Sequence, residues 1–255
     1  MIKTRKPVSL QGPLPVNHPL PKVAGIRPDP DGRVLSFAPG FDRDFVERLL
    51  GRRRRQKLSR STARRITIQE TEIPGLLKPR LVQQLVQPVA LDGNILLGEG
   101  LLLKNPKLVQ ALQDAVAVSC FVATIGPDLD RRIDKLQHQG RLANAAVLDA
   151  LGSGAVERVA DQFQKQVAAE YQGQGLVVGP RFSPGYCDWP LTDQPGLFSL
   201  LDHKQIGVEL DRSCLMQPRK SISAIFGLYP ATKAPADRNL IPCRRCKKQN
   251  CIARR

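Results

Sequence analysis

Aromatic side chains are scarce in this chain of 255 residues, at 5% of the total with a single tryptophan. This scarcity argues against a platform of stacked rings for single-stranded nucleic acid. The core must therefore be built mainly from Leu, Val, Ile and Ala. The hydrophobic content of 42% is sufficient for one substantial domain, with or without attached tails.

Long apolar runs are also missing. The longest, residues 115–125, is interrupted by Ser119 and Thr124 and is well short of the roughly 20 residues that a membrane-spanning helix needs. The N-terminus does not combine a basic start, an apolar run and a small-residue cleavage site, as a secretory signal would. We therefore expect a soluble cytoplasmic protein without membrane contact. In that compartment its six cysteines are expected to be thiols or metal ligands.

Acidic residues are absent from residues 238–255, which carry 7 Lys or Arg. Residues 1–65 hold 16 Lys or Arg against 5 Asp or Glu, whereas the middle of the chain is almost neutral. The net charge of +16 thus belongs to the two ends. Basic ends are compatible with nucleic acid or an acidic protein partner. The arginine run 52–55, which has no interleaved aromatics, is more typical of a solvated loop.

These shifts in composition divide the chain into four segments. The proline-rich residues 1–40 are predicted to form a disordered arm. Residues 41–65 are predicted to be a short helix and a basic linker. Residues 66–237 are expected to form the folded domain, and residues 238–255 a basic, cysteine-rich tail.

Hydrophobic periodicity within the chain favours an α+β domain, in which helices flank a twisted antiparallel sheet. It predicts helices over 41–50, 76–86, 107–115, 128–139, 141–171 and 197–201. It predicts strands over 66–73, 116–125, 207–210, 213–217 and 221–228, and a pair of short strands within 89–103. Gly152 and Gly154 lie within the longest predicted helix, where each glycine destabilises the helix by about 1 kcal/mol relative to alanine. Their presence indicates that a neighbouring backbone or a ligand packs closely there.

Four segments carry a likeness to a known family. They are T-I-G-P-D-L-D at 124–130, A-V-L-D-A-L-G-S-G-A-V-E-R-V-A-D at 146–161, R-F-S-P-G-Y at 181–186 and M-Q-P-R-K-S-I-S-A-I-F-G-L-Y at 216–229. In this order they resemble the S-adenosylmethionine-binding activation domain of vitamin B12-dependent methionine synthase, in particular its free-standing bacterial relatives. The resemblance covers roughly residues 66–230, and R-x-x-P-G-Y is its most specific part.

The resemblance implies a binding loop for S-adenosylmethionine at residues 181–186. Arg181 would grip the ligand carboxylate with its planar fork of donors. The turn containing Ser183 and Gly185 would bring backbone groups close to the adenine, since glycine adds no side chain. Tyr186 would offer its ring and hydroxyl to the positively charged methylthio group.

The resemblance also implies a helical acid and a second tyrosine in the site, at Glu157 and Tyr229. For Glu157 and for Arg181 the sequence also allows a plainer, structural interpretation. A single helical glutamate is more commonly exposed, and an arginine at a strand end such as Arg181 can serve only in a salt bridge. Both interpretations stay open at the level of the sequence.

The family domain presents S-adenosylmethionine to a corrinoid, so that a cobalt(II) form can be methylated with an electron from a partner. This chain has no cobalamin-binding segment, because its nearest match to D-x-H-x-x-G, residues 202–207, has the wrong spacing. His203 within it is expected to be a surface residue. We therefore expect cobalamin to arrive on a partner, a corrinoid protein or corrinoid methyltransferase, and the chain cannot be a complete methionine synthase.

A cysteine cluster occupies the basic tail. Cys243, Cys246 and Cys251 have the spacing C-x2-C-x4-C, and the adjacent Lys and Arg residues favour thiolates. A fourth ligand is needed for zinc or an iron-sulfur cluster, and Cys187 is the first candidate, with Cys214 second. An iron-sulfur cluster could pass an electron, whereas zinc could only hold the tail.

The sequence leaves two functions in competition. The first is an S-adenosylmethionine-binding accessory protein that reactivates or methylates a corrinoid protein, with an electron donor as a further partner. The second is a nucleic-acid-associated or adaptor protein that uses its basic ends and a cysteine-rich metal knuckle on a retained scaffold. The two differ in salt dependence, because contacts to phosphates weaken steeply as salt rises.

Overall fold

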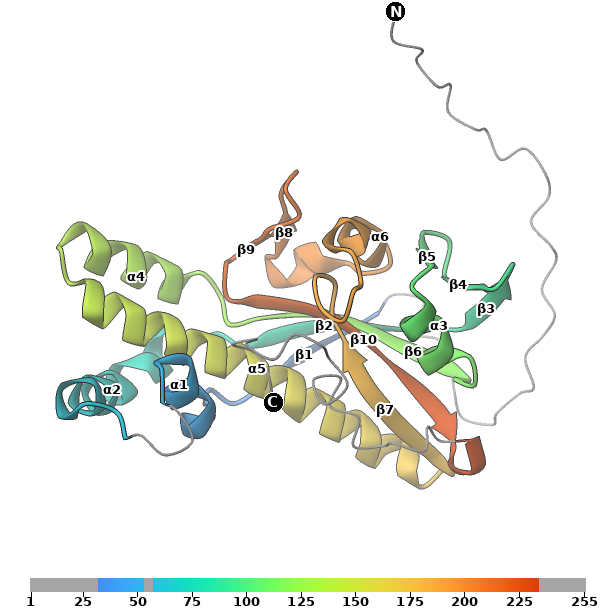
Figure 1. The fold of residues 1–255 in the computed structure, drawn as a ribbon, viewed down its shortest axis with the longest axis horizontal. Coiled ribbons are helices and arrows are strands. Elements are labelled where there is room, and N and C mark those ends of the chain that lie inside the picture. The colour runs from blue at the N-terminus through green and yellow to red at the C-terminus, as the bar shows by residue number, and fades with distance from the viewer. Residues whose placement is uncertain (1–31, 53–56, 234–255) are drawn as a thin grey trace, which may run out of the picture.

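The computed structural model describes residues 32–52 and 57–233. At its centre lies an antiparallel sheet of five strands in the order β1-β2-β6-β10-β7 (Figure 1). The strands are β1 Arg33–Ser36, β2 Arg80–Val86, β6 Ala117–Thr124, β7 Leu176–Phe182 and β10 Ser221–Pro230. Antiparallel strands combined with separate helices confirm the predicted α+β class.

The middle strand β6 explains how the sheet is covered. All eight of its residues are buried, so both faces of the sheet are packed. On one face Phe121 meets Phe163 and Phe226, with ring centroids 5.0 to 6.0 Å apart. On the other face Val118, Cys120 and Val122 join a second apolar cluster. Strand β6 therefore shows no alternation of apolar and polar residues, because both of its faces are buried.

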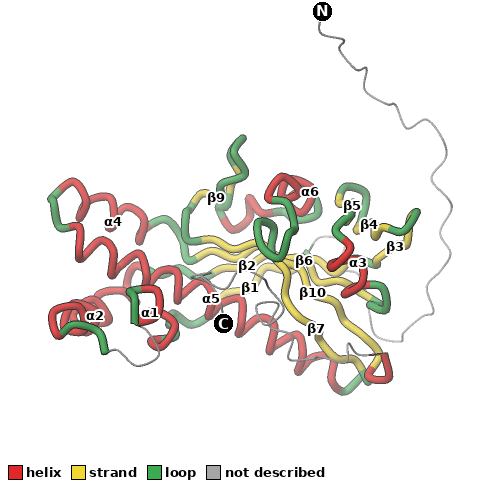
Figure 2. The backbone as a smooth tube through the Cα atoms, in the orientation of Figure 1, coloured by secondary structure: helices red, strands yellow, loops and turns green. Residues whose placement is uncertain are grey.

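Four helices cover the first face, as Figure 1 and Figure 2 show. They are α1 Arg43–Leu49, α2 Arg60–Glu72, α4 Asp128–His138 and the long α5 Leu142–Gln172. Helix α5 runs along the sheet, and Figure 1 shows the other three gathered around its N-terminal half. We call this side the α5 face.

Smaller elements cover the opposite face. They are the three-stranded sheet β3 Pro88–Leu91, β4 Asn94–Leu97 and β5 Leu101–Leu103, the helices α3 Pro106–Leu112 and α6 Gln194–Phe198, and the ribbon β8 Glu209–Leu210 with β9 Met216–Gln217. Single 3-10 turns lie at η1 Ile73–Leu76, η2 Leu191–Asp193, η3 His203–Ile206 and η4 Ala231–Lys233. Trp189 is almost fully buried in this second core.

Two predicted elements have the wrong type. Residues 66–73, predicted as a strand, belong mainly to helix α2 and its 3-10 extension. Ser59 caps α2 by accepting a hydrogen bond from the Thr62 amide at 3.1 Å. The buried residues Ile66, Gln69 and Ile73 follow helical spacing, so tertiary packing overrides the β-branched composition.

The second error concerns residues 76–86, predicted as a helix. This segment ends the 3-10 turn η1 and then forms strand β2. Leu81 and Leu85 enter the α5-face core, whereas Val82 and Val86 enter the opposite one. A strand that is apolar on both faces shows no alternation, which is why its spacing was mistaken for helical.

The N-terminal segment contributes more than an arm. Residues 33–36, which the sequence assigned to the arm, form strand β1 and pair with β2. Arg33 also bridges to Glu170 of α5, with Nη2 and Oε2 3.1 Å apart. Residues 1–31 lie outside the described part. Arg60, Arg64 and Arg65, expected in a basic linker, lie on helix α2.

The remaining predicted helices and strands are confirmed within a few residues. Gly152 and Gly154 also prove to be sites of close packing. A Cβ at Gly152 would lie 2.2 Å from Leu129 Cδ2, and one at Gly154 would lie 2.7 Å from Val46 Cγ2. Neighbouring side chains therefore fill the space beside both glycines. No helix in the described ranges has the length and apolar character to cross a bilayer.

Candidate ligand-binding site

Arg181 occupies the penultimate position of edge strand β7. Side chains alternate across a strand, and its neighbour Phe182 enters the second core. Arg181 therefore points to the α5 face, in register with Phe226 of β10. Its side chain is only 11% exposed. A cation at this depth needs partners.

Two carboxylates of helix α5 supply those partners. Arg181 Nη2 donates to Glu157 Oε2 at 2.7 Å, and Nη1 donates to Asp161 Oδ1 at 3.1 Å. Glu157 and Asp161 are four residues apart and share one face of the helix. Their side chains are 27% and 45% exposed. The three groups carry a combined charge of −1 and can be reached by solvent from the carboxylate side.

The segment after β7 forms a sharp turn. The Tyr186 amide donates to the Ser183 carbonyl at 3.1 Å, and the Gly185 amide donates to the Trp189 carbonyl at 2.8 Å. Gly185 has φ +86°, a conformation that L-residues with side chains seldom adopt. The side chain of Tyr186 is 54% exposed although its neighbour Trp189 is buried.

A pocket of about 140 Å³ opens beside the two carboxylates. Gly154, Glu157, Arg158 and Asp161 of α5 form one wall. The opposite wall comes from α1 and its N-cap, with Asp42, Phe45 and Arg48. This volume is below the roughly 300–1,000 Å³ typical of small-molecule sites, so a larger ligand would also lie against the neighbouring surface.

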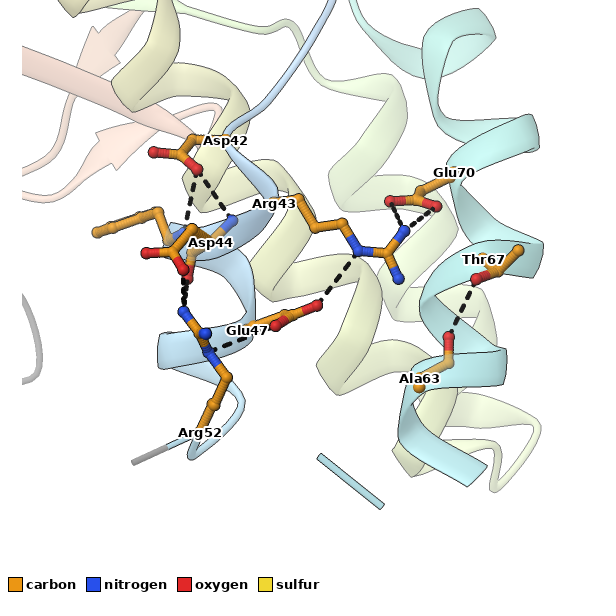
Figure 3. Close-up of polar contacts among 9 residues, drawn as sticks. Asp42, Arg43, Asp44, Glu47, Arg52, Ala63, Thr67 and Glu70 are labelled. Carbon is orange, nitrogen blue, oxygen red and sulfur yellow. Dashed lines mark hydrogen bonds and ion pairs between the residues drawn. The ribbon is translucent and has the colours of Figure 1, made fainter. Parts of the chain in front are cut away.

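The α1 wall is fastened to the rest of the domain by ion pairs, which Figure 3 shows. Asp42 caps α1 by accepting hydrogen bonds from the Asp44 and Phe45 amides at 2.9 and 3.3 Å. Arg43 reaches Glu47 within α1 at 3.2 Å and Glu70 of α2 at 2.9 Å. These contacts fix the distance between α1 and its neighbours, and hence the width of the pocket.

The structure brings some of the predicted site residues together and separates another. Arg181 and Glu157 are in direct contact, and Ser183, Gly185 and Tyr186 follow within five residues. Tyr229 does not join them, because it points into the second core with 1% of its surface exposed. Its hydroxyl donates to the Ala111 carbonyl at 2.6 Å, and burial raises the pKa of this hydroxyl.

Asp161 is the residue that the sequence analysis missed. Its place one helical turn after Glu157 was a usable signal, because residues i and i+4 share a helix face. The α1 wall had no comparable signal, since it depends on how distant segments pack. The salt bridge considered for Arg181 is present, although with two carboxylates rather than one.

The cysteines outside the tail do not form a metal site by themselves. Cys187 and Cys214 are partly exposed and have φ values of +54° and +63°. Among the described residues, no cluster of three or more Cys, His, Asp or Glu side chains fits a metal ion. Cys243, Cys246 and Cys251 lie outside that part of the chain, so the zinc or iron-sulfur site stays a prediction.

Two smaller predictions are settled by the structure. Cys120 lies in the core, as expected, and burial raises the pKa of its thiol. His203 is less exposed than expected, because it packs against Phe198 at a centroid distance of 4.8 Å and bonds the Val208 carbonyl through Nδ1.

Comparisons with known proteins agree with this architecture. A family model described as "Vitamin B12 dependent methionine synthase, activation domain" matches residues 107–235, just over half of the chain. No curated protein matches the sequence. Among solved structures, the chain is similar to the MetH reactivation domain in a crystal structure with bound AdoHcy. The TM-score is 0.58 and the identity 18%, over 78% of each chain, so this likeness concerns the fold. The chain belongs to the family of the activation domain of vitamin B12-dependent methionine synthase.

Proposed function

We propose that this protein binds S-adenosylmethionine between α5, α1 and the end of β7. There it would serve as the methyl-donor platform for a corrinoid carried by a partner. The observation that carries the proposal is the group of Arg181, Glu157 and Asp161 beside the pocket. Membership of the activation-domain family supports the same role.

The charges of this group suit the amino-acid end of the ligand. Arg181 offers a planar fork to a carboxylate, and Glu157 and Asp161 offer acceptors to an ammonium group. In the protein Arg181 is paired with both carboxylates. The ligand would therefore enter by exchange: its carboxylate takes over Arg181, and its ammonium takes over the released carboxylates.

The carboxylates also suit the sulfonium centre. Glu157 and Asp161 are partly exposed, and a carboxylate that Arg181 releases can face the positive charge on the ligand's sulfur. The Ser183–Tyr186 turn lies next along the chain and exposes backbone groups and the Tyr186 ring. We assign this turn to the nucleoside part of the ligand.

The protein's task in methyl transfer is to hold and orient the donor. A partner reductant supplies one electron to the cobalt(II) corrinoid, and the resulting cobalt electron pair attacks the methyl carbon. The carbon–sulfur bond breaks, the methyl group stays on the cobalt, and S-adenosylhomocysteine is released. No side chain needs to gain or lose a proton, so positioning is the protein's contribution.

Isothermal titration of the full chain with S-adenosylmethionine tests the proposal. Truncation of a charge-paired residue at a binding site typically costs at least about 2 kcal/mol, which is about 30-fold in Kd. We expect Arg181→Ala to weaken binding by at least that factor. 5′-Methylthioadenosine, which lacks both the amino-acid end and the sulfonium charge, should lose at least as much affinity.

Arg33→Ala is a matched control, because Arg33 also links a strand to α5, through Glu170. It should leave the affinity unchanged. Absence of binding by the wild-type protein, or equal affinities for wild type and Arg181→Ala, would refute the site.

A further inference from the structure

A second pocket lies at the other end of the helical layer. It has a volume of about 50 Å³ and lies between α2, α4 and the beginning of α5. Leu148 is the last α5 residue in its wall and comes six residues before Gly154 of the other pocket. At 1.5 Å per residue, the two walls are about 9 Å apart along the helix, and they share no residue. The two sites are therefore separate.

Three arginines from three elements converge on this pocket, together with one acid. They are Arg65 of α2, Arg132 of α4 and Arg141 before α5. Arg132 Nη2 donates to Glu72 at 3.3 Å, and Arg65 Nε donates to Asn144 Oδ1 at 3.2 Å. Within the described residues, the Arg141 side chain makes no hydrogen bond or ion pair. The wall keeps an excess of two positive charges.

The beginning of α5 adds to this positive character. Arg141 is the N-cap of the 31-residue helix and provides no side-chain cap. The first amides of a helix have no acceptor within the helix, and the aligned peptide dipoles place partial positive charge there. Such an end favours an anion when side chains support it.

Gln69 gives an independent indication of a ligand. The residue lines the pocket and is 6% exposed. Its Nε2 donates to the Asn144 carbonyl at 3.0 Å, which fixes the orientation of the amide. Its Oε1 is buried and accepts no hydrogen bond from any described residue. Buried polar atoms without partners are rare, so this acceptor needs a donor.

We propose that this pocket binds a phosphate group that keeps one proton. Its charged oxygens accept hydrogen bonds from the arginines. Its remaining P–OH donates to Gln69 Oε1. Inorganic phosphate and small phosphate monoesters share this chemistry: inorganic phosphate keeps at least one P–OH near neutral pH, and a monoester keeps its proton in part near its second pKa of about 6. Sulfate has the same shape but no proton to donate, so Gln69 distinguishes the two anions.

The test is titration of the full chain with inorganic phosphate, with glycerol phosphate and with sulfate, near the second pKa of phosphate esters, at about pH 6. We expect a preference of at least about tenfold for phosphate over sulfate, as for one hydrogen bond to a charged group. Binding of inorganic phosphate assigns the site to the free ion. Binding of glycerol phosphate alone assigns it to a phosphorylated small molecule.

Two variants and one control connect the binding to these residues. Arg141→Gln should weaken phosphate binding at least about tenfold. The free energy of unfolding should not change, because the Arg141 side chain makes no hydrogen bond or ion pair within the described residues. Gln69→Met should keep anion binding but lose the preference over sulfate. Arg131→Gln, next to Arg132 but paired with Asp128 outside the pocket, should bind as the wild type does.

Three outcomes would overturn the proposal: neither phosphate compound binds, sulfate binds as well as phosphate, or Arg131→Gln loses as much affinity as Arg141→Gln. If Gln69→Met does not fold, the Arg141→Gln variant and the comparison with sulfate still test whether the pocket binds phosphate. Titration of Arg141→Gln with S-adenosylmethionine separates this site from the proposed function, since that affinity should not change.

Discussion

Replacing Gly152 by alanine should destabilise the protein, although alanine is the better helix former. An added Cβ would lie 2.2 Å from Leu129 Cδ2 and 3.1 Å from Lys220 Cγ. Leu129 is fully buried between α4 and α5, so it cannot turn away into solvent. Overpacking a core lowers the free energy of unfolding by up to about 3 kcal/mol, and the higher helix propensity of alanine offsets about 1 kcal/mol of this loss. We expect a net loss of about 2 kcal/mol.

Urea unfolding followed by far-UV circular dichroism measures this loss. For a domain of this size, 2 kcal/mol corresponds to a decrease in Tm of about 4–8 °C. Gly173→Ala is the matched control. Gly173 ends the same helix at φ −65°, and nothing lies within 4 Å of its added Cβ. That variant should be more stable by about 0.4–1 kcal/mol.

A double-mutant cycle tests the cause. Leu129→Ala alone should cost about 2–5 kcal/mol through the cavity that it creates. The methyl group of Gly152→Ala partly fills that cavity, so the double variant should lose at least about 1 kcal/mol less than the sum of the single losses. Wild-type stability of Gly152→Ala, or additive losses, would refute the packing argument.

Three further predictions follow from other contacts. Ser59→Ala removes the cap of α2 and should cost about 1 kcal/mol in urea unfolding, whereas Ser59→Asp should restore it. Hydrogen bonds from the Ser213 hydroxyl, and then from nearby backbone amides, lower the pKa of Asp211, so its ionised form stabilises the β8–β9 ribbon above the unfolded value of about 3.9. This stabilisation is lost as the pH falls through the lowered pKa, and hydrogen exchange in the ribbon should lose that acid dependence in Asp211→Asn. Cys120 is buried, and burial raises the pKa of its thiol, so iodoacetamide should label Cys120 only after unfolding. Cys187 is partly exposed and should be labelled in the folded protein.

The sequence predicted most of the fold where burial was one-sided. Helix α4 places Leu129, Ile133 and Leu136 on one buried face, and the periodicity located it correctly. The errors fell where that signal fails. Strand β2 is buried on both faces, and α2 carries threonines and isoleucines that favour strands in isolation. Neither environment is visible before the chain is packed.

The candidate site was predictable to a similar degree. A motif sufficed to select Arg181, and the helix containing Glu157 was placed correctly. Their ion pair and the α1 wall depend on which face of β7 meets α5, and a one-residue shift of register would reverse that face. Tyr229 follows the plain alternation of β10: Ala224, Phe226 and Leu228 face α5, whereas Ile225 and Tyr229 face the second core.

The pairing of β6 with β10 has a consequence for synthesis of the protein. Thr124 and Ser221 are neighbours in the sheet but 97 residues apart in the chain. At 5–20 residues per second, the ribosome needs about 5–20 s to deliver this partner after β6 has been made. During that interval an eight-residue apolar strand has one unpaired edge, which is a template for association with other chains. Slow translation between the two strands should therefore increase aggregation and dependence on chaperones, even when the finished fold is stable.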